Sequence, residues 1–442
     1  MVVLLKTLQV ILALSVLIII HEFGHFIYSK IFGIRVEKFF LFFDIGGVKL
    51  FSTRTGWFAR LFPSAKNWET EYGIGWLPLG GYCKISGMVD ESMDLETLRK
   101  EPEKWEFRTK PAWQRLLVMA GGVLFNFIFA IIAYCSILGI WGSAYIPNSQ
   151  ASIYPNELAA EMGFRPGDRI LALDDYVPDD FSSLQADIVR RDVRFATVLR
   201  GDDTLKLYID RAMVPQMLES PLMFDLAMPF TVDSVMSESN MALRKGDEIL
   251  AVAGTDTRFL QDARGVLADH AGQEVSATVS RDGVLMEMPL QVDTLGKLGI
   301  ALGMPPVERK HYNALSCIPA GLKLAGSTVT GYLQDLKMVF TPSTGAYKSV
   351  GSFIAIGQVF PKKWDWYRFL NIVALLSIML GVMNLIPIPG LDGGHILFTL
   401  FEMITGRKPS DKFLMVMQMI GMVLLLMLMV LAFGNDISRL IH

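Results

Sequence analysis

The feature that most constrains this chain is a pair of histidines and a glutamate at the end of an apolar run. The run from Ile11 to Ile20 is followed directly by His21-Glu22-Phe23-Gly24-His25. Such a run predicts a membrane-spanning helix, in which ionisable side chains cost several kcal/mol unless a site compensates them. This cost disfavours the alternative interpretation, two hydrogen-bonded histidines in an ordinary packed helix.

The spacing of these residues is typical of a metal site. Residues four apart share one face of a helix, so His21 and His25 can present imidazole nitrogens to the same ion. Glu22, one position round the helix, can reach water bound to that ion. The pattern therefore predicts metal-assisted hydrolysis, and a catalytic zinc would need a third protein ligand.

Composition limits the class of protein. Of the 442 residues, 52% are hydrophobic and 19% are charged, and the mean hydropathy is +0.38. This is too apolar for an ordinary soluble protein and too charged for a bundle of spans alone, so we expect a membrane protein with a sizeable aqueous part. The net charge of −3 and the scattered basic residues argue against nucleic acid as a partner. Cys83, Cys135 and Cys317 lie in different contexts and indicate no disulfide framework.

Four segments are long and apolar enough to cross a bilayer. They run from Val3 to Tyr28, Ala112 to Trp141, Phe369 to Ile388 and Phe413 to Phe433. No small-residue cleavage site follows the first, so we interpret it as an uncleaved span. The third is interrupted by Pro387, Pro389 and Gly390, which is tolerated at membrane depth only where protein or a cavity satisfies the backbone.

The broken third segment supplies the candidates for the missing ligand. It contains Asn384-Leu385-Ile386-Pro387-Ile388-Pro389-Gly390-Leu391-Asp392-Gly393-Gly394-His395. We favour Asp392 as the third ligand, although His395 would coordinate equally well on chemistry alone. In this arrangement Glu22 accepts a proton from water and delivers it to the leaving amine.

Basic residues near the span ends predict the orientation. Those after the first span, before the second, and between the third and fourth favour a cytoplasmic location, whereas residues 142–164 contain no Lys or Arg. Lys6, Lys362, Lys363 and Arg368 oppose this but are outnumbered. We therefore expect both termini and the large segment after the second span on the outer side.

The loop after the first span predicts a small antiparallel sheet at the membrane surface, from strands at Val36–Phe43, Gly47–Phe51 and Tyr72–Ile85. Its interfacial anchors would be Trp57, Phe58, Leu61, Phe62, Trp68 and Trp76. The open edge of this sheet could bind an extended substrate strand. An equal alternative is that the strands only fill space within the helix bundle. The charged stretch from Asp90 to Lys110 predicts a pair of surface helices.

The outer segment contains a duplication. Gly167-Asp168 and Gly246-Asp247 each precede an apolar strand, with an offset of 79 residues. The run from Gly246 to Gly254 resembles the Gly-Asp-x-Ile-Leu-x-Val/Leu-x-Gly signature of PDZ domains, whereas the first copy ends in Asp175. The resemblance implies peptide binding by strand addition, with a spacer or size-exclusion role as the alternative. Beyond these copies, Leu315 to Phe340 predicts one or two amphipathic helices, either on the outer membrane surface or packed against the spans.

Taken together, His21-Glu22-Phe23-Gly24-His25 and Asn384-x-x-Pro387-x-Pro389-x-Leu391-Asp392-Gly393 resemble the site-2 protease family of intramembrane zinc metalloproteases. The resemblance implies Zn²⁺ held by His21, His25 and Asp392, with Glu22 as the acid-base residue. It implies substrate contacts from Asn384, in the segment that includes Pro387 and Pro389, and from Asn126 of the second span. The loop from Pro78 to Lys84 is similar to the family's membrane-associated hairpin. One departure is Gly351-Ser352, where the family has Gly-Pro, which puts the local loop geometry in question.

The expected fold is a polytopic α-helical membrane protein with four spans, a membrane-associated β-hairpin or sheet, and two tandem PDZ-like α+β domains. The expected parts are 1–30, 31–111, 112–142, 143–222 and 223–305 (the PDZ-like pair), 306–366, 367–396 and 397–442. The resemblance implies cleavage within transmembrane segments of pre-trimmed single-span proteins, such as an anti-sigma factor or remnant signal peptides. It places the protein in the bacterial inner membrane, with the zinc site near the cytoplasmic side.

Two other classes of function compete with this interpretation. An inactive membrane scaffold would present the PDZ-like domains and retain a vestigial site, but the complete ligand set with Glu22 argues against it. A soluble zincin-type peptidase tethered by its spans would need a third ligand in an aqueous domain. Neither His270 nor His311 lies in a His-Glu-x-x-His pattern, and no second His is near either of them.

Overall fold

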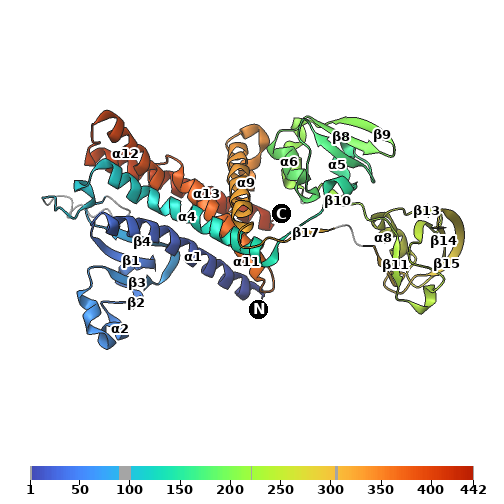
Figure 1. Cartoon of the computed structure of the whole chain (residues 1–442), viewed down its shortest axis with the longest axis horizontal. Helices are drawn as coiled ribbons and strands as arrows, with labels where there is room; N and C mark the ends of the chain where they lie inside the picture. The colour runs from blue at the N-terminus through green and yellow to red at the C-terminus, as the bar shows by residue number, and fades with distance from the viewer. Residues whose placement is uncertain (1, 89–100, 221, 304–306, 442) are drawn as a thin grey trace. The chain divides into compact units, whose positions relative to one another are not determined.

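The computed structural model describes residues 2–88, 101–220, 222–303 and 307–441. The chain forms two compact units (Figure 1). The first comprises Met1–Gly142, His311–Phe340 and Tyr347–His442, and the second comprises Ser143–Lys310 and Thr341–Ala346. The first unit contains the long apolar helices together with a small sheet, so we describe it first.

The first unit is built around long helices. Its main helices are α1 (Val2–Ile31), α4 (Ala112–Trp141), α9 (Cys317–Val339), α10 (Phe353–Val359), α11 (Trp366–Leu385), α12 (Asp392–Thr405) and α13 (Asp411–Ile441). Among the described residues, α1, α4, α11 and the 412–438 part of α13 are long and apolar enough to cross a membrane. Helix α12 follows the proline break, and we did not predict it from the sequence as a separate helix. It ends before Gly406, which adopts the left-handed conformation that often terminates helices.

Glycines allow α1 and α4 to approach closely, and Figure 1 shows the two helices side by side. A Cβ atom at Gly24 would overlap the carbonyl oxygen of Gly121, so the two backbones touch at this point. Small residues at helix crossings are a general means of close packing between membrane helices. The crossing brings the middle of α4 against the turn of α1 that carries His21 and His25.

Helix α4 is the centre of this unit, because α1, α9, α11 and α12 all pack against it. The core between α4, α9 and α11 contains Ala130, Tyr134, Ala325, Ala374 and Ile378, all of them buried. Of the two arrangements considered for Leu315 to Phe340, the structure therefore has the one in which a single helix packs against the spans.

The departure at Ser352 is accommodated by Asp436 of α13. The Asp436 carboxylate accepts hydrogen bonds from the Ser352 backbone N–H at 2.8 Å, the Ser352 hydroxyl at 2.5 Å and the Ala355 N–H at 3.3 Å. These donors lie at the N-terminus of α10, where an anion is favourable. Since proline has no N–H, the substitution adds a donor that the family's Gly-Pro pattern lacks.

The sheet after α1 has the strand order β2-β3-β1-β4. Its strands are β1 (Val36–Phe43), β2 (Lys49–Ser52), β3 (Glu71–Gly75) and β4 (Leu77–Ile85), with the short helix α2 (Gly56–Leu61) after β2. The predicted antiparallel pairing holds for β1 with β4 and for β2 with β3, but β1 and β3 are parallel. The expected strand over Tyr72–Ile85 was wrong, because it divides at Trp76 and its halves flank β1.

The division at Trp76 depends on a glycine. A Cβ atom at Gly75 would overlap the carbonyl oxygen of Phe43, so only a glycine lets the chain cross the end of β1. The indole of Trp76 donates a hydrogen bond to the Ile45 carbonyl at 3.0 Å and fixes this crossing. Beyond the sheet, the predicted surface helices over Asp90–Lys110 fall partly outside the described residues, and residues 101–110 contain only the short 3-10 helix Phe107–Thr109.

The second unit repeats one arrangement of strands and helices. Its first copy contains β6 (Ile153–Pro155), α5 (Glu157–Glu161), β7 (Arg169–Leu173), α6 (Leu184–Arg190), β8 (Phe195–Arg200), β9 (Asp203–Tyr208), α7 (Val214–Glu219) and β10 (Phe224–Leu226). Its second contains β11 (Val232–Val235), β12 (Glu248–Val252), β13 (Thr255–Asp256), α8 (Leu260–Asp269), β14 (Glu274–Arg281), β15 (Val284–Gln291) and β16 (Ile300–Leu302). β5 (Ser143–Tyr145) and β17 (Glu308–Lys310) pair where the chain enters and leaves the copies.

The Gly-Asp turns have the same role in both copies. Asp168 forms a two-pronged ion pair with Arg200, with both distances 2.8 Å, and Asp247 forms the same pair with Arg281, with both distances 2.7 Å. Each aspartate also accepts a backbone N–H three residues earlier in the chain. The repeated sequence motif is thus a repeated hydrogen-bonded turn.

Candidate metal and catalytic site

The two histidines of the motif direct their side chains toward each other. His21 and His25 are buried on the face of α1 that meets α4, and their Nε2 atoms are 3.3 Å apart. This follows from the four-residue spacing, which superimposes the two side chains on consecutive turns. The motif therefore produces the paired donors that the sequence predicts.

Asp392 completes the group. It is the first residue of α12, and its Oδ2 atom is 3.1 Å from His21 Nε2 and 3.4 Å from His25 Nε2. The same oxygen is buried without a hydrogen-bond partner among the described residues. In the part of the chain that the structure describes, these three residues are the group whose ligand atoms converge closely enough to hold a metal ion.

The geometry of the group fits zinc. Ligand atoms about 2.0–2.1 Å from a tetrahedral ion lie about 3.3 Å from one another. The three separations here are 3.1, 3.3 and 3.4 Å, so one ion can contact all three atoms without rearrangement. A buried carboxylate oxygen with no donor of its own is the polar atom that such an ion would satisfy.

The alternative ligand, His395, lies in the same region but outside the group. It lines the cavity described below, one turn into α12, while Asp392 at the helix N-terminus is the residue next to the histidines. An anionic side chain is also favoured at this first turn by the helix dipole. Asp392, the ligand that we favoured from the sequence, is thus the residue that lies with the two histidines.

Helix α4 orients both imidazole rings. The Nδ1 atom of His25 is 2.9 Å from the Val118 carbonyl, and Nδ1 of His21 is 3.0 Å from Nδ2 of Asn126. Asn126 is fully buried and does not line the cavity, so its position differs from that of a substrate-contacting residue. The contact with His25 is absent from the sequence motif, because it comes from a backbone carbonyl.

Sequence reasoning also missed Gly122. A Cβ atom at this position would lie 2.5 Å from His25 Nε2 and 2.6 Å from His21 Cε1. Only a glycine therefore leaves room for both rings against α4. A glycine inside an apolar span is a weak signal by itself, because it often serves only helix packing.

Glu22 is directed away from α4 and toward the sheet. Its carboxylate lies near the two histidines and Asp392 and accepts a hydrogen bond from the Cys83 backbone in β4. It also lines a cavity of about 860 Å³ that contains the candidate metal ligands. Glu22 is therefore placed to exchange protons with a molecule in that cavity.

Several other elements line the cavity, among them β4 and α11. β4 contributes residues 80–85, and α11 contributes Asn384, whose Nδ2 atom is 3.2 Å from His21 Nε2. Pro387 and Pro389 do not line the cavity. They lie in the turn between α11 and α12, where Gly421 of α13 packs directly on the Pro389 carbonyl, and this turn directs Asp392 to the histidines.

Two histidines and an aspartate that could hold a metal ion, with a glutamate beside them on a helix apolar enough to span a membrane, fit one class of protein: a membrane zinc metalloprotease. Residues 9–428 match Peptidase family M50, and the chain belongs to that family. It is 31% identical over 461 residues to the regulator of sigma-E protease RseP of Salmonella typhimurium, covering 97% of this chain and 98% of the relative. It is 29% identical over 479 residues to RseP of Escherichia coli, again covering 97% and 98%. The family depends on zinc, in agreement with the ligand geometry.

Proposed function

We propose that this protease hydrolyses peptide bonds inside the transmembrane segments of single-span proteins that have already been trimmed outside the membrane. The observation that carries the proposal is the location of His21, Glu22 and His25 within a helix apolar enough to span a bilayer. Its similarity to proteases named for sigma-E regulation supports an anti-sigma factor as substrate, and remnant signal peptides share the same single-span form.

The chemistry follows from the residues around the cavity. His21, His25 and Asp392 would hold zinc, which supplies a Lewis acid that lowers the pKa of water and polarises a carbonyl group. Glu22 would accept the proton of the attacking water and donate it to the nitrogen of the leaving amine. Asn126 and the Val118 carbonyl would hold the imidazoles in the orientation that presents Nε2.

A substrate helix must unwind before its peptide bonds become accessible, because each bond is shielded by helical hydrogen bonds. β4 is the terminal strand of its sheet, and residues 80–85 of that strand border the cavity. We propose that an extended substrate segment pairs with this edge while Asn384 holds the segment beside the scissile bond. Gly or Pro in the substrate span should then promote cleavage, and equal cleavage of stiff, Leu-rich spans would contradict this.

We further propose that the repeated copies in residues 143–305 are PDZ-like domains that restrict access. The shared Gly-Asp turn and the shared strand order support the assignment. Bulky outer domains would be excluded, and a peptide or the outer part of a substrate would bind at the copies. Deleting residues 151–294 should therefore allow cleavage of an untrimmed substrate, whereas continued rejection would indicate an inert spacer.

The distribution of basic residues supports an orientation in the bacterial inner membrane with both termini and the PDZ-like copies in the periplasm. The zinc site would then lie near the cytoplasmic side. Reporter fusions at residues 150 and 410 test this, because a periplasm-dependent enzyme should be active only at the first.

The central experiment compares wild type with Glu22→Gln on a membrane-embedded single-span reporter. Wild type should cleave the reporter and Glu22→Gln should not, while both should bind zinc. A scaffold would give the same result for both proteins. Asp392→Asn should lose both zinc and cleavage.

A further inference from the structure

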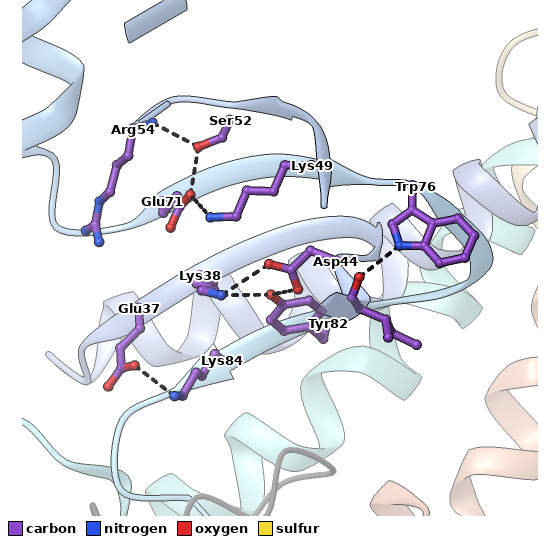
Figure 2. A network of polar contacts seen from close by, with 11 residues as sticks. Glu37, Lys38, Asp44, Lys49, Ser52, Arg54, Glu71, Trp76, Tyr82 and Lys84 are labelled. Carbon is purple, nitrogen blue, oxygen red and sulfur yellow. Dashed lines mark hydrogen bonds and ion pairs between the residues drawn. The ribbon is translucent and has the colours of Figure 1, made fainter. Parts of the chain in front are cut away.

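A network of polar contacts runs along the sheet after α1 (Figure 2). Lys38 on β1 contacts Asp44 at 3.3 Å and the Tyr82 hydroxyl at 3.4 Å, and Tyr82 donates a hydrogen bond to Asp44 at 2.7 Å. On the neighbouring strand, Lys84 pairs with Glu37 at 3.3 Å. The network therefore contains both cationic and anionic side chains.

Lys38 and Lys84 occupy positions in the sheet where their like charges repel each other. Lys38 and Lys84 are directly opposite one another in the pairing of β1 with β4. Like charges at opposed positions of an antiparallel pair are destabilising. Both side chains also line the cavity that contains the metal ligands. Asp44, which also lines the cavity, and Glu37 offset part of this repulsion, and a further anion in the cavity next to β4 would offset more of it.

The ion pairs of these lysines with Asp44 and Glu37 are long. Charge-assisted N–H to O contacts are usually about 2.7–2.9 Å, and both lysines are 3.3 Å from their carboxylate partners. By contrast, Lys49 in the same network is 2.6 Å from Glu71 and does not line the cavity. The side chains of Lys38 and Lys84 remain 33% and 24% exposed. The contact of Lys38 with its carboxylate partner is thus longer than that of Lys49.

We propose that Lys38 and Lys84 recognise an acidic side chain of the substrate next to the cleaved bond. This inference rests on the proposed function, because it requires an extended substrate strand on the open edge of β4. Side chains alternate between the two faces of a strand, so every second substrate residue would lie on the face of Tyr82 and Lys84. An Asp or Glu there would approach both ammonium groups, whereas a Lys or Arg would be repelled.

The test uses the full-length zinc-loaded protein in vesicles of zwitterionic lipid, so that no lipid carries a net negative charge that would compete. A single-span reporter carries Asp, Asn or Lys in turn at consecutive positions along the segment beside the cleaved bond. The ratio of kcat/KM for the Asp and Lys reporters should be about three- to tenfold at alternate positions and near one between them. High salt should reduce the ratio.

Variants identify the residues responsible. Lys38→Met with Lys84→Met should bring the ratio to about one, Lys38→Arg should keep it, and Lys38→Glu should favour the Lys reporter. Lys49→Met is the matched control and should retain the wild-type ratio. A ratio that is the same in wild type and the double variant, or that lacks the two-residue alternation, would overturn the proposal.

The charge preference can be absent even if the proposed function is correct. If wild type cleaves the Asn reporter and Glu22→Gln does not, intramembrane proteolysis stands whatever the charge preference. If neither protein cleaves any reporter, the proposed function fails and this inference fails with it.

Discussion

The side-chain amide of Asn126 lies 3.0 Å from Nδ1 of His21, on the side of the ring opposite the metal ligands. The two residues belong to different helices, α4 and α1, that meet at a glycine crossing. The contact leaves Nε2 of His21 directed at Asp392. We therefore propose that Asn126 fixes the orientation of the His21 ring, and that this is its role in place of substrate contact.

Asn126→Ala should weaken zinc binding by about 10- to 100-fold, because removal of a partner that orients a histidine ligand has effects of this size. Competition with a chelator of known affinity measures it. Asn371→Ala is the control, because Asn371 is an asparagine of α11 that bonds the Tyr367 carbonyl and does not line the cavity. Equal zinc affinity of the two variants would contradict the role of Asn126.

Gly122→Ala should disrupt the metal site, because the added methyl group would lie 2.5 Å from His25 Nε2. We expect loss of most bound zinc and of cleavage. Gly139→Ala on the same helix is a matched control, since its Cβ would meet nothing closer than 4.0 Å. Metal analysis of both purified variants checks this, and full zinc content in Gly122→Ala would show that α4 moves to make room.

Glu22→Gln should separate chemistry from metal binding. Glu22 is not in the group of metal ligands, so the variant should keep zinc and lose about 10²- to 10⁴-fold in kcat, as expected for removal of a general base. Asp392→Asn should lose zinc as well. Retention of activity by Glu22→Gln would show that another group transfers the proton.

Ser352→Pro should destabilise the contact between α10 and α13. It removes the N–H that donates to Asp436, and leaving a buried carboxylate short of a donor costs about 1–3 kcal/mol. Ser352→Ala keeps that N–H and loses only the hydroxyl, so it should have a smaller effect. Thermal unfolding in detergent compares the two, and a larger effect of Ser352→Ala would show that the hydroxyl dominates.

The second of the repeated copies should lose stability in acid through Asp247. Arg281 holds the pKa of Asp247 below its ordinary value, with help from the Arg244 backbone N–H, although burial alone would raise it. Because the folded-state pKa is lowered, this contribution is complete above the unfolded pKa of about 3.9 and is lost as the pH falls through the folded value.

Asp247→Asn should therefore destabilise the second copy by about 1.5–3 kcal/mol at neutral pH, the usual contribution of hydrogen bonds to charged groups. The difference from wild type should shrink as the pH is lowered below about 4. Hydrogen exchange of peptides from β12 and β14 in the full-length protein measures it. A difference that does not change with pH would show that the Asp247 charge contributes nothing.

Local patterns predicted the parts of the structure that depend on nearby residues. The apolar runs correspond to α1, α4, α11 and α13, and the four-residue spacing of His21 and His25 places them on one face. The strand pairing was predicted less well. The parallel pairing of β1 and β3 depends on the crossing at Gly75, where the chain passes the end of β1, and no strand pattern contains that information.

The sequence alone determined which residues could bind a metal and which segments could lie in a membrane, because helical periodicity and hydrophobicity act over a few turns. Only the tertiary structure showed that Asp392 rather than His395 lies in the group with the two histidines, and that Asn126 and Gly122 of α4 contact them. Those relationships depend on helix crossings between distant segments. The distances that define the site arise from packing, which no local spacing in the chain records.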